Sequence, residues 1–151
     1  MTEPVPGGVV ALPDAEAVIA DYLAAQFAAS TASAATFPLS GISVGDRLPA
    51  TYDSSEPAVT LDRLAGPPGP VPVWSDVAHL DIRAYGPVKA TAYALIAQIR
   101  PLLFAARYLG AAGAVIQSVD EHVGPQWLPD PDGDYPESGY YLLQVAVTLH
   151  P

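Results

Sequence analysis

The class of fold is indicated by the segment Tyr140-Tyr-Leu-Leu-Gln-Val-Ala-Val-Thr-Leu-His150. Its apolar side chains recur at every second position, as they do in a β-strand with one buried face. The face expected to be buried consists of Tyr141, Leu143, Val145, Val147 and Leu149. A second alternating segment, Ala114 to Val123, precedes it, so we predict that the chain ends in a pair of strands.

The two strands enclose a segment that is rich in proline and aspartate and is predicted to be a loop, Gly124-Pro-Gln-Trp-Leu-Pro-Asp-Pro-Asp-Gly-Asp-Tyr-Pro-Glu-Ser-Gly139. Residues 120 to 137 contain six acids and no base, whereas residues 86 to 119 contain three bases and no acid. Two patches of opposite charge on one subunit favour head-to-tail contacts between copies, which close into a ring when the rotation allows. The alternative is a solvated dipolar surface.

The segments before this pair predict one helix and three strands. The helix is expected to begin at Pro13, because proline suits a first helical position and Asp14 and Glu16 suit the positive helix N-terminus. It is expected to end within residues 30–33, where Ser and Thr compete for backbone hydrogen bonds. Its apolar face consists of Ala15, Val18, Ile19, Tyr22, Leu23 and Phe27. The predicted strands are Gly41 to Leu48, Ala58 to Leu64 and Val77 to Tyr85.

A second and longer helix is predicted from Pro87 to Leu109. Its expected core stripe, with steps of three and four residues, is Val88, Ala92, Leu95, Ile99, Leu102, Ala106 and Leu109. Pro101 lies inside it and predicts a kink, because proline removes an amide donor. Gly110 and Gly113 are expected to end the helix. A second stripe on this helix carries Lys89, Tyr93, Arg100 and Arg107.

We therefore predict one α+β domain over residues 1–151, in the order helix, three strands, helix, two strands. An antiparallel or mixed sheet of four to five strands is expected to carry both helices on one face. Residues 1–11 are expected to be flexible. Residues 66–73 are expected to form a Pro-rich arm, because six of the first seven are Pro or Gly and cannot join a central strand.

The composition excludes several classes of function. The net charge of −10 prevents counterion release from driving tight nucleic-acid binding, although an acidic wall could border DNA by repelling it. The absence of Cys excludes disulfides and thiolate metal sites. No signal peptide is visible at the start, so we expect use in a cytoplasm or in a particle built there. Charged residues make up only 15%, against about 25% in typical domains, which suggests that neighbours cover part of the surface.

Two groups of side chains have the residue types of metal sites. Asp130, Asp132 and Asp134 alternate as in a calcium loop, but the sixth and twelfth positions hold Tyr135 and Tyr141 in place of Gly and Glu. Ordinary turn chemistry therefore explains them better. A cluster of His79 and His122 with Asp81 and Asp120 requires neighbouring strands and has weak ligand spacing. We expect no metal and no cofactor.

No catalytic motif is present in the sequence. It lacks a nucleophile elbow and a Gly-rich phosphate loop, so we expect a protein that is not an enzyme. Trp74 and Trp127 lie in Pro-rich segments, where a tryptophan either anchors the segment to its own core or binds a partner. Both alternatives stay open here. The candidate subunit or partner interface consists of Trp74, Lys89, Arg100, Arg107, Trp127, Asp130, Asp132 and Asp134.

Five segments together resemble the tail terminator proteins of long-tailed, siphovirus-type bacteriophages, particularly those of high-GC actinobacteria. They are Leu12-Pro-Asp-Ala-Glu-Ala17, Val44-Gly-Asp-Arg-Leu-Pro49, Asp81-Ile-Arg-Ala-Tyr85, Gly124-Pro-Gln-Trp-Leu-Pro-Asp-Pro131 and the strand Tyr141 to Leu149. The resemblance covers nearly the whole chain, and Trp-Leu-Pro-Asp-Pro is its most specific part.

The resemblance implies a non-enzymatic structural protein of the virion tail at its head-proximal end, assembled in the host cytoplasm. Such proteins form a homo-hexameric ring that caps the tail tube, stops its polymerisation and binds the head-to-tail connector or neck protein. The implied partners are other copies of the chain, the major tail tube protein and the connector. DNA passes through the lumen without specific binding.

From the charge pattern we expect contacts between subunits. The arm Gly66 to Val73 and the acidic loop Asp130 to Glu137 are expected to reach neighbours. The stripe of Lys89, Arg100 and Arg107 is expected to meet acids of the adjacent subunit. The alternatives are a connector-side head-completion or neck protein and a small cytoplasmic ligand-binding α+β module.

Overall fold

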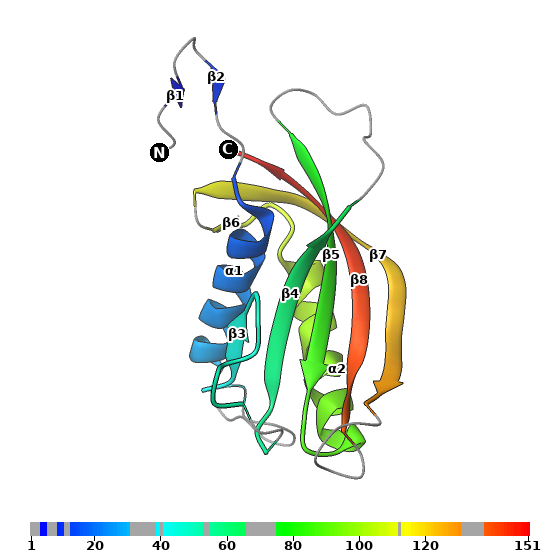
Figure 1. Ribbon diagram of the computed structural model, residues 1–151. Coiled ribbons are helices and arrows are strands. Elements are labelled where there is room, and N and C mark those ends of the chain that lie inside the picture. The colour runs from blue at the N-terminus through cyan, green and yellow to red at the C-terminus, as the bar shows by residue number, and fades with distance from the viewer. Residues whose placement is uncertain are drawn as a thin grey trace.

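A curled six-stranded sheet with both helices packed on one of its faces forms the body of the protein (Figure 1). The structure is a computed structural model. It describes residues 4–5, 9–10, 13–30, 39, 41–52, 55–65, 75–111, 113–130 and 138–151.

The helices are α1 (Ala15–Ala29) and α2 (Lys89–Ala105). The strands of the main sheet are β3 (Ser43–Gly45), β4 (Ala58–Leu64), β5 (Asp76–Tyr85), β6 (Gly110–Ala111), β7 (Ala114–Pro129) and β8 (Gly139–His150). Two further short strands, β1 (Pro4–Val5) and β2 (Val9–Val10), pair only with each other.

The sheet has the order β3-β4-β5-β8-β7-β6. It is mixed, because β3 runs parallel to β4 and every other neighbouring pair is antiparallel. The predicted α+β class, the single domain and the order of the main elements are confirmed. The expected number of strands was one too low, because the two-residue β6 contains Gly110, which was expected to end the second helix.

Helix α1 agrees closely with the prediction. It begins after Asp14, whose carboxylate accepts hydrogen bonds from the amides of Glu16 (3.0 Å) and Ala17 (3.4 Å), as an N-cap residue does. It ends at Ala29, and the amide of Ser30 donates a hydrogen bond to the carbonyl of Phe27 in the last turn. All six residues of the predicted apolar face are buried.

Helix α2 is shorter than predicted, and its core stripe is shifted. Tyr108 has a left-handed φ of 68° and ends the helical path, so Leu109 lies beyond the helix and is exposed. Val88 precedes the helix and is also exposed, so the prediction that these two residues belong to the core was wrong. The buried side chains on this side are Ala92, Leu95, Ile96, Ile99, Leu103 and Ala106.

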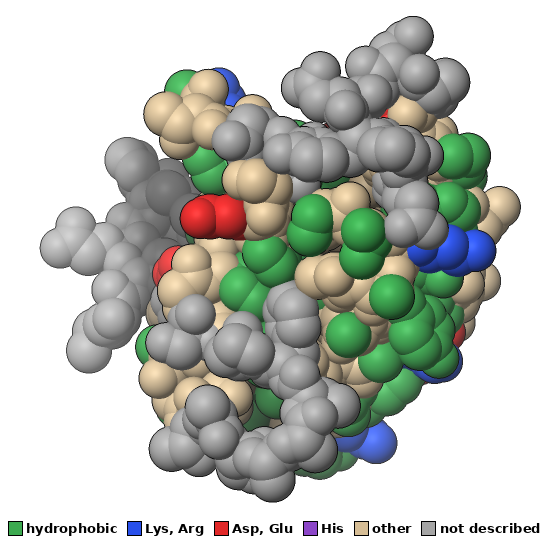
Figure 2. Space-filling model, turned by 90° about the horizontal axis from the view of Figure 1, so that it is seen from below, with side chains coloured by type: hydrophobic (Ala, Val, Ile, Leu, Met, Phe, Trp, Pro, Cys, Tyr) green, Lys and Arg blue, Asp and Glu red, His purple; other side chains and the backbone are tan. Residues whose placement is uncertain are grey.

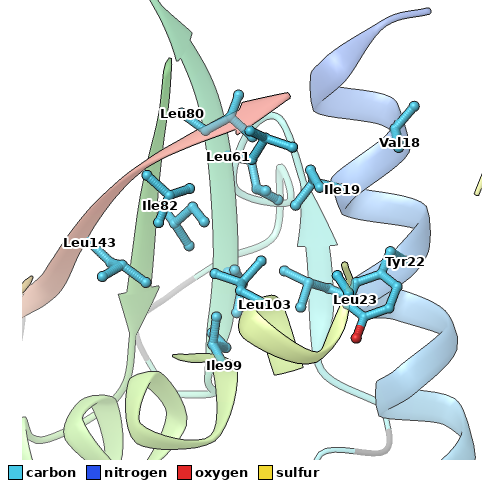
Figure 3. Close-up of a cluster of buried hydrophobic side chains, with 14 of the residues drawn as sticks. Val18, Ile19, Tyr22, Leu23, Leu61, Leu80, Ile82, Ile99, Leu103 and Leu143 are labelled. Atoms are coloured by element: carbon cyan, nitrogen blue, oxygen red, sulfur yellow. The ribbon is translucent and has the colours of Figure 1, made fainter. Parts of the chain in front are cut away.

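The core lies between the helices and the sheet (Figure 3). The predicted inner face of β5 is confirmed, since Ala78, Leu80, Ile82 and Ala84 are all buried. The side chains that meet in Figure 3 include Val18, Ile19 and Leu23 of α1, Leu61, Leu80, Ile82 and Leu143 of the sheet, and Ile99 and Leu103 of α2.

Strand β7 extends into the segment that was predicted to be a loop. Gly124 to Pro129 belong to this strand, and Leu128 pairs with Tyr140 of β8. The register shifts at three places along β7, so the segment with Gly124 and Pro125 is accommodated as an irregularity and not as a strand end. The expectation of a loop beginning at Gly124 was therefore wrong.

Candidate assembly surface

The basic side chain of Arg100 joins α2 to β7. Its Nη2 atom lies 3.0 Å from Oε1 of Glu121, and its Nε atom donates to Oε2 at 3.2 Å. Glu121 faces the helices because it pairs in register with Val145, whose side chain is in the core. Arg100 therefore has a carboxylate partner within its own chain. Lys89 and Arg107 are the other two bases that the sequence analysis expected to meet acids of an adjacent subunit.

Trp127 packs on its own subunit. Its ring lies 5.2 Å from that of Tyr141 on β8, and Tyr141 in turn contacts Tyr93 of α2 at 5.5 Å. The ammonium group of Lys89 lies 5.8 Å from the centre of the Trp127 ring, within the range of a cation–π contact. Of the two alternatives for this tryptophan, its contacts are those of an anchor that holds the end of β7 against β8 and α2.

The side of α2 opposite the core is also apolar. Its exposed apolar residues, spaced by three and four positions, are Ala90, Tyr93, Ala97, Pro101 and Phe104. Together with the exposed Tyr108, which lies beyond the end of the helix, we call them the outer stripe. Tyr93, Phe104 and Tyr108 are 55%, 47% and 68% exposed. The outer side of a surface helix is normally polar. Sequence reasoning placed Tyr93 on a stripe with Lys89, Arg100 and Arg107 and missed the other exposed apolar residues, although their helical spacing was visible.

The bases of α2 lie along one flank of the outer stripe. By helical spacing, Lys89 and Arg100 share the flank between the outer stripe and the core side, and Arg107 follows the end of the helix. The guanidinium of Arg107 lies 4.8 Å from the ring centre of Tyr108. Neither Lys89 nor Arg107 forms an ion pair with any residue that the structure describes. An apolar stripe with cations along one edge suits a partner that carries an apolar patch beside acids.

The other flank of the outer stripe borders a hollow of about 450 Å³ between the two helices. Ala97 and Pro101 line it from α2, and Gln26 and Ala29 line it from α1.

A hydrogen bond links the two helices near this hollow, where the hydroxyl of Tyr22 donates to the carbonyl of Leu102 at 2.5 Å. Burial raises the pKa of Tyr22 above its usual value.

The face of the sheet away from the helices carries an ion pair whose carboxylate is buried and whose guanidinium is partly exposed. Nη2 of Arg83 lies 3.0 Å from Oδ2 of Asp81, whose side chain is only 5% exposed. Burial lowers the pKa of Arg83, while hydrogen bonds to Tyr85 and Asp81 raise it, and the net shift is upward. Oδ1 of Asp81 has no hydrogen-bond partner among the residues that the structure describes. Asp62 pairs in register with Asp81, which places two carboxylates on this face.

The two histidines that sequence reasoning considered together do meet. The rings of His79 and His122 lie 5.5 Å apart, although β8 separates their strands. Ala146, which pairs with His79, lies on that intervening strand. The described parts of the chain contain no group of three or more His, Asp or Glu side chains that could hold a metal ion.

The remaining predicted interface residues lie at or beyond the limits of the described chain. Asp130 is exposed, and its amide donates to the carbonyl of Ser138 at 2.8 Å. Trp74, Asp132 and Asp134 lie outside the described residues, as does the arm 66–73.

The outer edge of β7 is poorly suited to pairing with a strand of another chain. Only the first residues of β7 pair with β6. Three register shifts and the prolines at 125 and 129 interrupt the rest, and such features are known to protect sheet edges. A side-chain surface such as the outer stripe is better suited to binding a partner than this strand edge is.

No protein-family model matches the sequence, and no curated protein matches it. Within the described part of the chain, neither helix has the length and apolar character that crossing a membrane requires.

Proposed function

We propose that this chain is the subunit of a homo-hexameric tail terminator ring, which caps the tail tube of a long-tailed bacteriophage and joins it to the head connector. The observation that carries the proposal is the outer stripe of α2. It gives the subunit a second apolar surface, on the side of the helix that faces away from its own core.

The composition of the outer stripe fits a contact between proteins. Tyr93 and Phe104 are large and more than a third exposed. Aromatic side chains are enriched among the residues that dominate binding energy at protein interfaces. The small Ala97 between them lets a partner approach the helix closely. Burying this stripe against a neighbour would remove apolar surface from water, at about 25 cal/mol for each Å².

The charge distribution supports assembly of identical subunits. Lys89 and Arg107 lie beside the outer stripe, whereas Asp120 and Asp130 are exposed on and just after β7. A neighbour related by rotation can present its acids to these bases. With a net charge of −10 for each subunit, the lumen of such a ring would repel DNA and let it pass without binding.

The proposed role is structural and needs no cofactor, metal or catalytic group. The protein would act in the virion, at the head-proximal end of the tail, after assembly in the host cytoplasm. Its partners would be other copies of itself, the major tail tube protein and the connector or neck protein.

Electron microscopy of purified tail tubes incubated with the protein tests this role. We expect a sixfold ring at one end of each tube and no further growth when fresh tube subunits are added. Tubes that stay uncapped and continue to grow would contradict the terminator role. Binding of the protein to isolated connectors without any effect on tubes would favour a connector-side neck protein.

A further inference from the structure

Three tyrosines form a groove at the lower end of the sheet. The rings of Tyr52 and Tyr85 lie 5.9 Å apart, and those of Tyr85 and Tyr140 lie 5.3 Å apart. Together with Leu48 and Pro129 they line a hollow of about 500 Å³, which we call the tyrosine groove. Figure 2 looks onto this end of the molecule, where hydrophobic side chains gather over a broad area.

The groove has polar groups as well as aromatic rings. The guanidinium of Arg83, which is paired with Asp81, lies 4.8 Å from the ring centre of Tyr140. Asp130 contributes to the lining from the end of β7. The three rings meet edge-on or tilted, at interplanar angles of 69° and 45°. Grooves lined by aromatic side chains are the usual binding surface for Pro-rich peptides.

This same chain contains a segment of that chemistry. Residues 66–73 read Gly-Pro-Pro-Gly-Pro-Val-Pro-Val, with prolines at 67 and 70 in the spacing Pro-x-x-Pro. Such sequences favour the polyproline II conformation, which exposes its carbonyls and loses little entropy on binding. We propose that the Pro-rich arm of one copy docks in the tyrosine groove of a second copy.

The arm cannot reach the groove of its own subunit. The arm connects the end of β4 to the start of β5. Arg63, near the end of β4, and Asp76, at the start of β5, are held together by two hydrogen bonds of 2.8 Å, so these two strand ends are adjacent. A connection of nine residues whose two ends are adjacent can extend at most about 17 Å from those ends. Tyr85 lies nine residues along β5 from Asp76, or about 30 Å away. The start of β5, next to the arm, and its end, which carries Tyr85, lie at opposite ends of the sheet (Figure 1).

The consequence is a head-to-tail contact. Each copy gives one arm and accepts one arm on a different surface, so the contact is heterologous and either closes into a ring or continues as a filament. The inference deepens the proposed ring, on which it rests, by naming a donor segment and an acceptor site in addition to the outer stripe.

A peptide titration tests the contact without requiring a ring. The full-length protein with Pro67→Ser, Pro70→Ser and Pro72→Ser serves as the acceptor, because its own arm no longer competes. A synthetic peptide of residues 65–75 is added, and the tyrosine ring signals are followed by NMR. We expect saturable binding that shifts Tyr52, Tyr85 and Tyr140, and at least tenfold weaker binding of a peptide with the same three serines. Equal binding of the two peptides, or shifts confined to other residues, would overturn the proposal.

A mixing experiment tests the direction of the contact. A groove variant, Tyr85→Ser with Tyr140→Ser, keeps its arm, and the arm variant keeps its groove. Each contributes only half of the contact, so an equal mixture is expected to gain a complex that neither variant forms alone. A mixture with no new complex would overturn the proposal. If the groove variant does not fold, Tyr52→Ala replaces it and is expected to weaken peptide binding to the same site. Failure of the terminator role would instead appear in tube capping, which these measurements do not use.

Discussion

Arg100 of α2 and Glu121 of β7 hold each other within one subunit, with Nη2 of the arginine 3.0 Å from Oε1 of the glutamate. The pair fastens the second helix to the sheet on the side where β7 has no long neighbouring strand. It also means that the basic and acidic segments of the sequence already meet inside the fold. A test of contacts between subunits should therefore change Arg107 and leave Arg100 intact.

Replacing Arg100 with Ala is expected to lower the free energy of unfolding by about 0.5 to 1 kcal/mol, the range for a partly exposed ion pair. Glu121→Gln should cost a similar amount, and the double variant should cost less than the sum of the two. Urea denaturation measures all three. Arg107→Ala is the matched control and should leave stability unchanged. A strictly additive double variant would show that the pair contributes nothing.

Gly139→Ala should destabilise the end of the β7–β8 pair. A Cβ atom there would lie 2.5 Å from the carbonyl oxygen of Leu128 and 2.8 Å from the ring of Trp127, so the backbone must shift. We expect a loss of at least about 2 kcal/mol in chemical denaturation, as for other overpacked sites. Gly45→Ala is the control, since its nearest contact of 3.7 Å is ordinary. Equal stability of the two variants would contradict this packing.

Arg83→Met should leave the carboxylate of Asp81 buried without its partner. Because Arg83 is 38% exposed, we expect a cost of about 2 kcal/mol, below the range for fully buried pairs. Adding Asp81→Asn should recover part of this loss. The control is Arg47→Met, whose pair with Asp46 is 85% and 61% exposed and should matter little. If the double variant recovers no stability, the unpaired carboxylate of Asp81 is not the cause of the loss.

Tyr22→Phe should lower stability and change its dependence on pH. Loss of the hydrogen bond to the Leu102 carbonyl should cost about 1 kcal/mol at neutral pH. Burial raises the pKa of Tyr22, so the folded chain holds this proton more tightly than the unfolded chain, whose tyrosines ionise near pH 10. This contribution is complete below about pH 10 and is lost as the pH rises through the folded pKa. The Phe variant should therefore lose less stability in alkaline solution. Parallel curves for the two proteins would contradict this account.

The outer stripe should control assembly without supporting the fold. Phe104→Ser with Tyr108→Ser is expected to weaken self-association or tube capping at least tenfold, while the free energy of unfolding changes by less than about 0.5 kcal/mol. Light scattering and denaturation measure the two effects. Ala24→Ser with Ala28→Ser, on the exposed side of α1, is the matched control and should leave assembly unchanged. Unaltered assembly of the stripe variant would remove the outer stripe from the interface.

The elements that depend on residues close together in the sequence were predictable. Helix α1 begins at a capping aspartate and has one apolar face, and both signals lie within its own sequence. The alternation in β5 and β8 likewise identified their buried faces, because a strand with one face in the core has a period of two. These elements depend little on distant parts of the chain.

The missed features depend on residues that are far apart in the sequence. Gly124 to Pro129 continue β7 because Trp127 stacks on Tyr141 and Leu128 pairs with Tyr140, which outweighs their weak intrinsic preference for a strand. Nothing in the chemistry of Tyr108 favours the left-handed backbone that ends the path of α2. The pairing of Arg100 with Glu121 depends on a strand register that the alternation alone could not supply.

The most direct test of the terminator role is the length of tails in particles assembled without this protein. Electron microscopy of a phage stock in which its gene carries an early stop codon would measure the distribution of tail lengths. The proposed role predicts overlong tails of variable length that lack heads, and restored lengths when the intact gene is supplied. Tails of normal, uniform length without heads would contradict it and would instead favour a protein on the connector side.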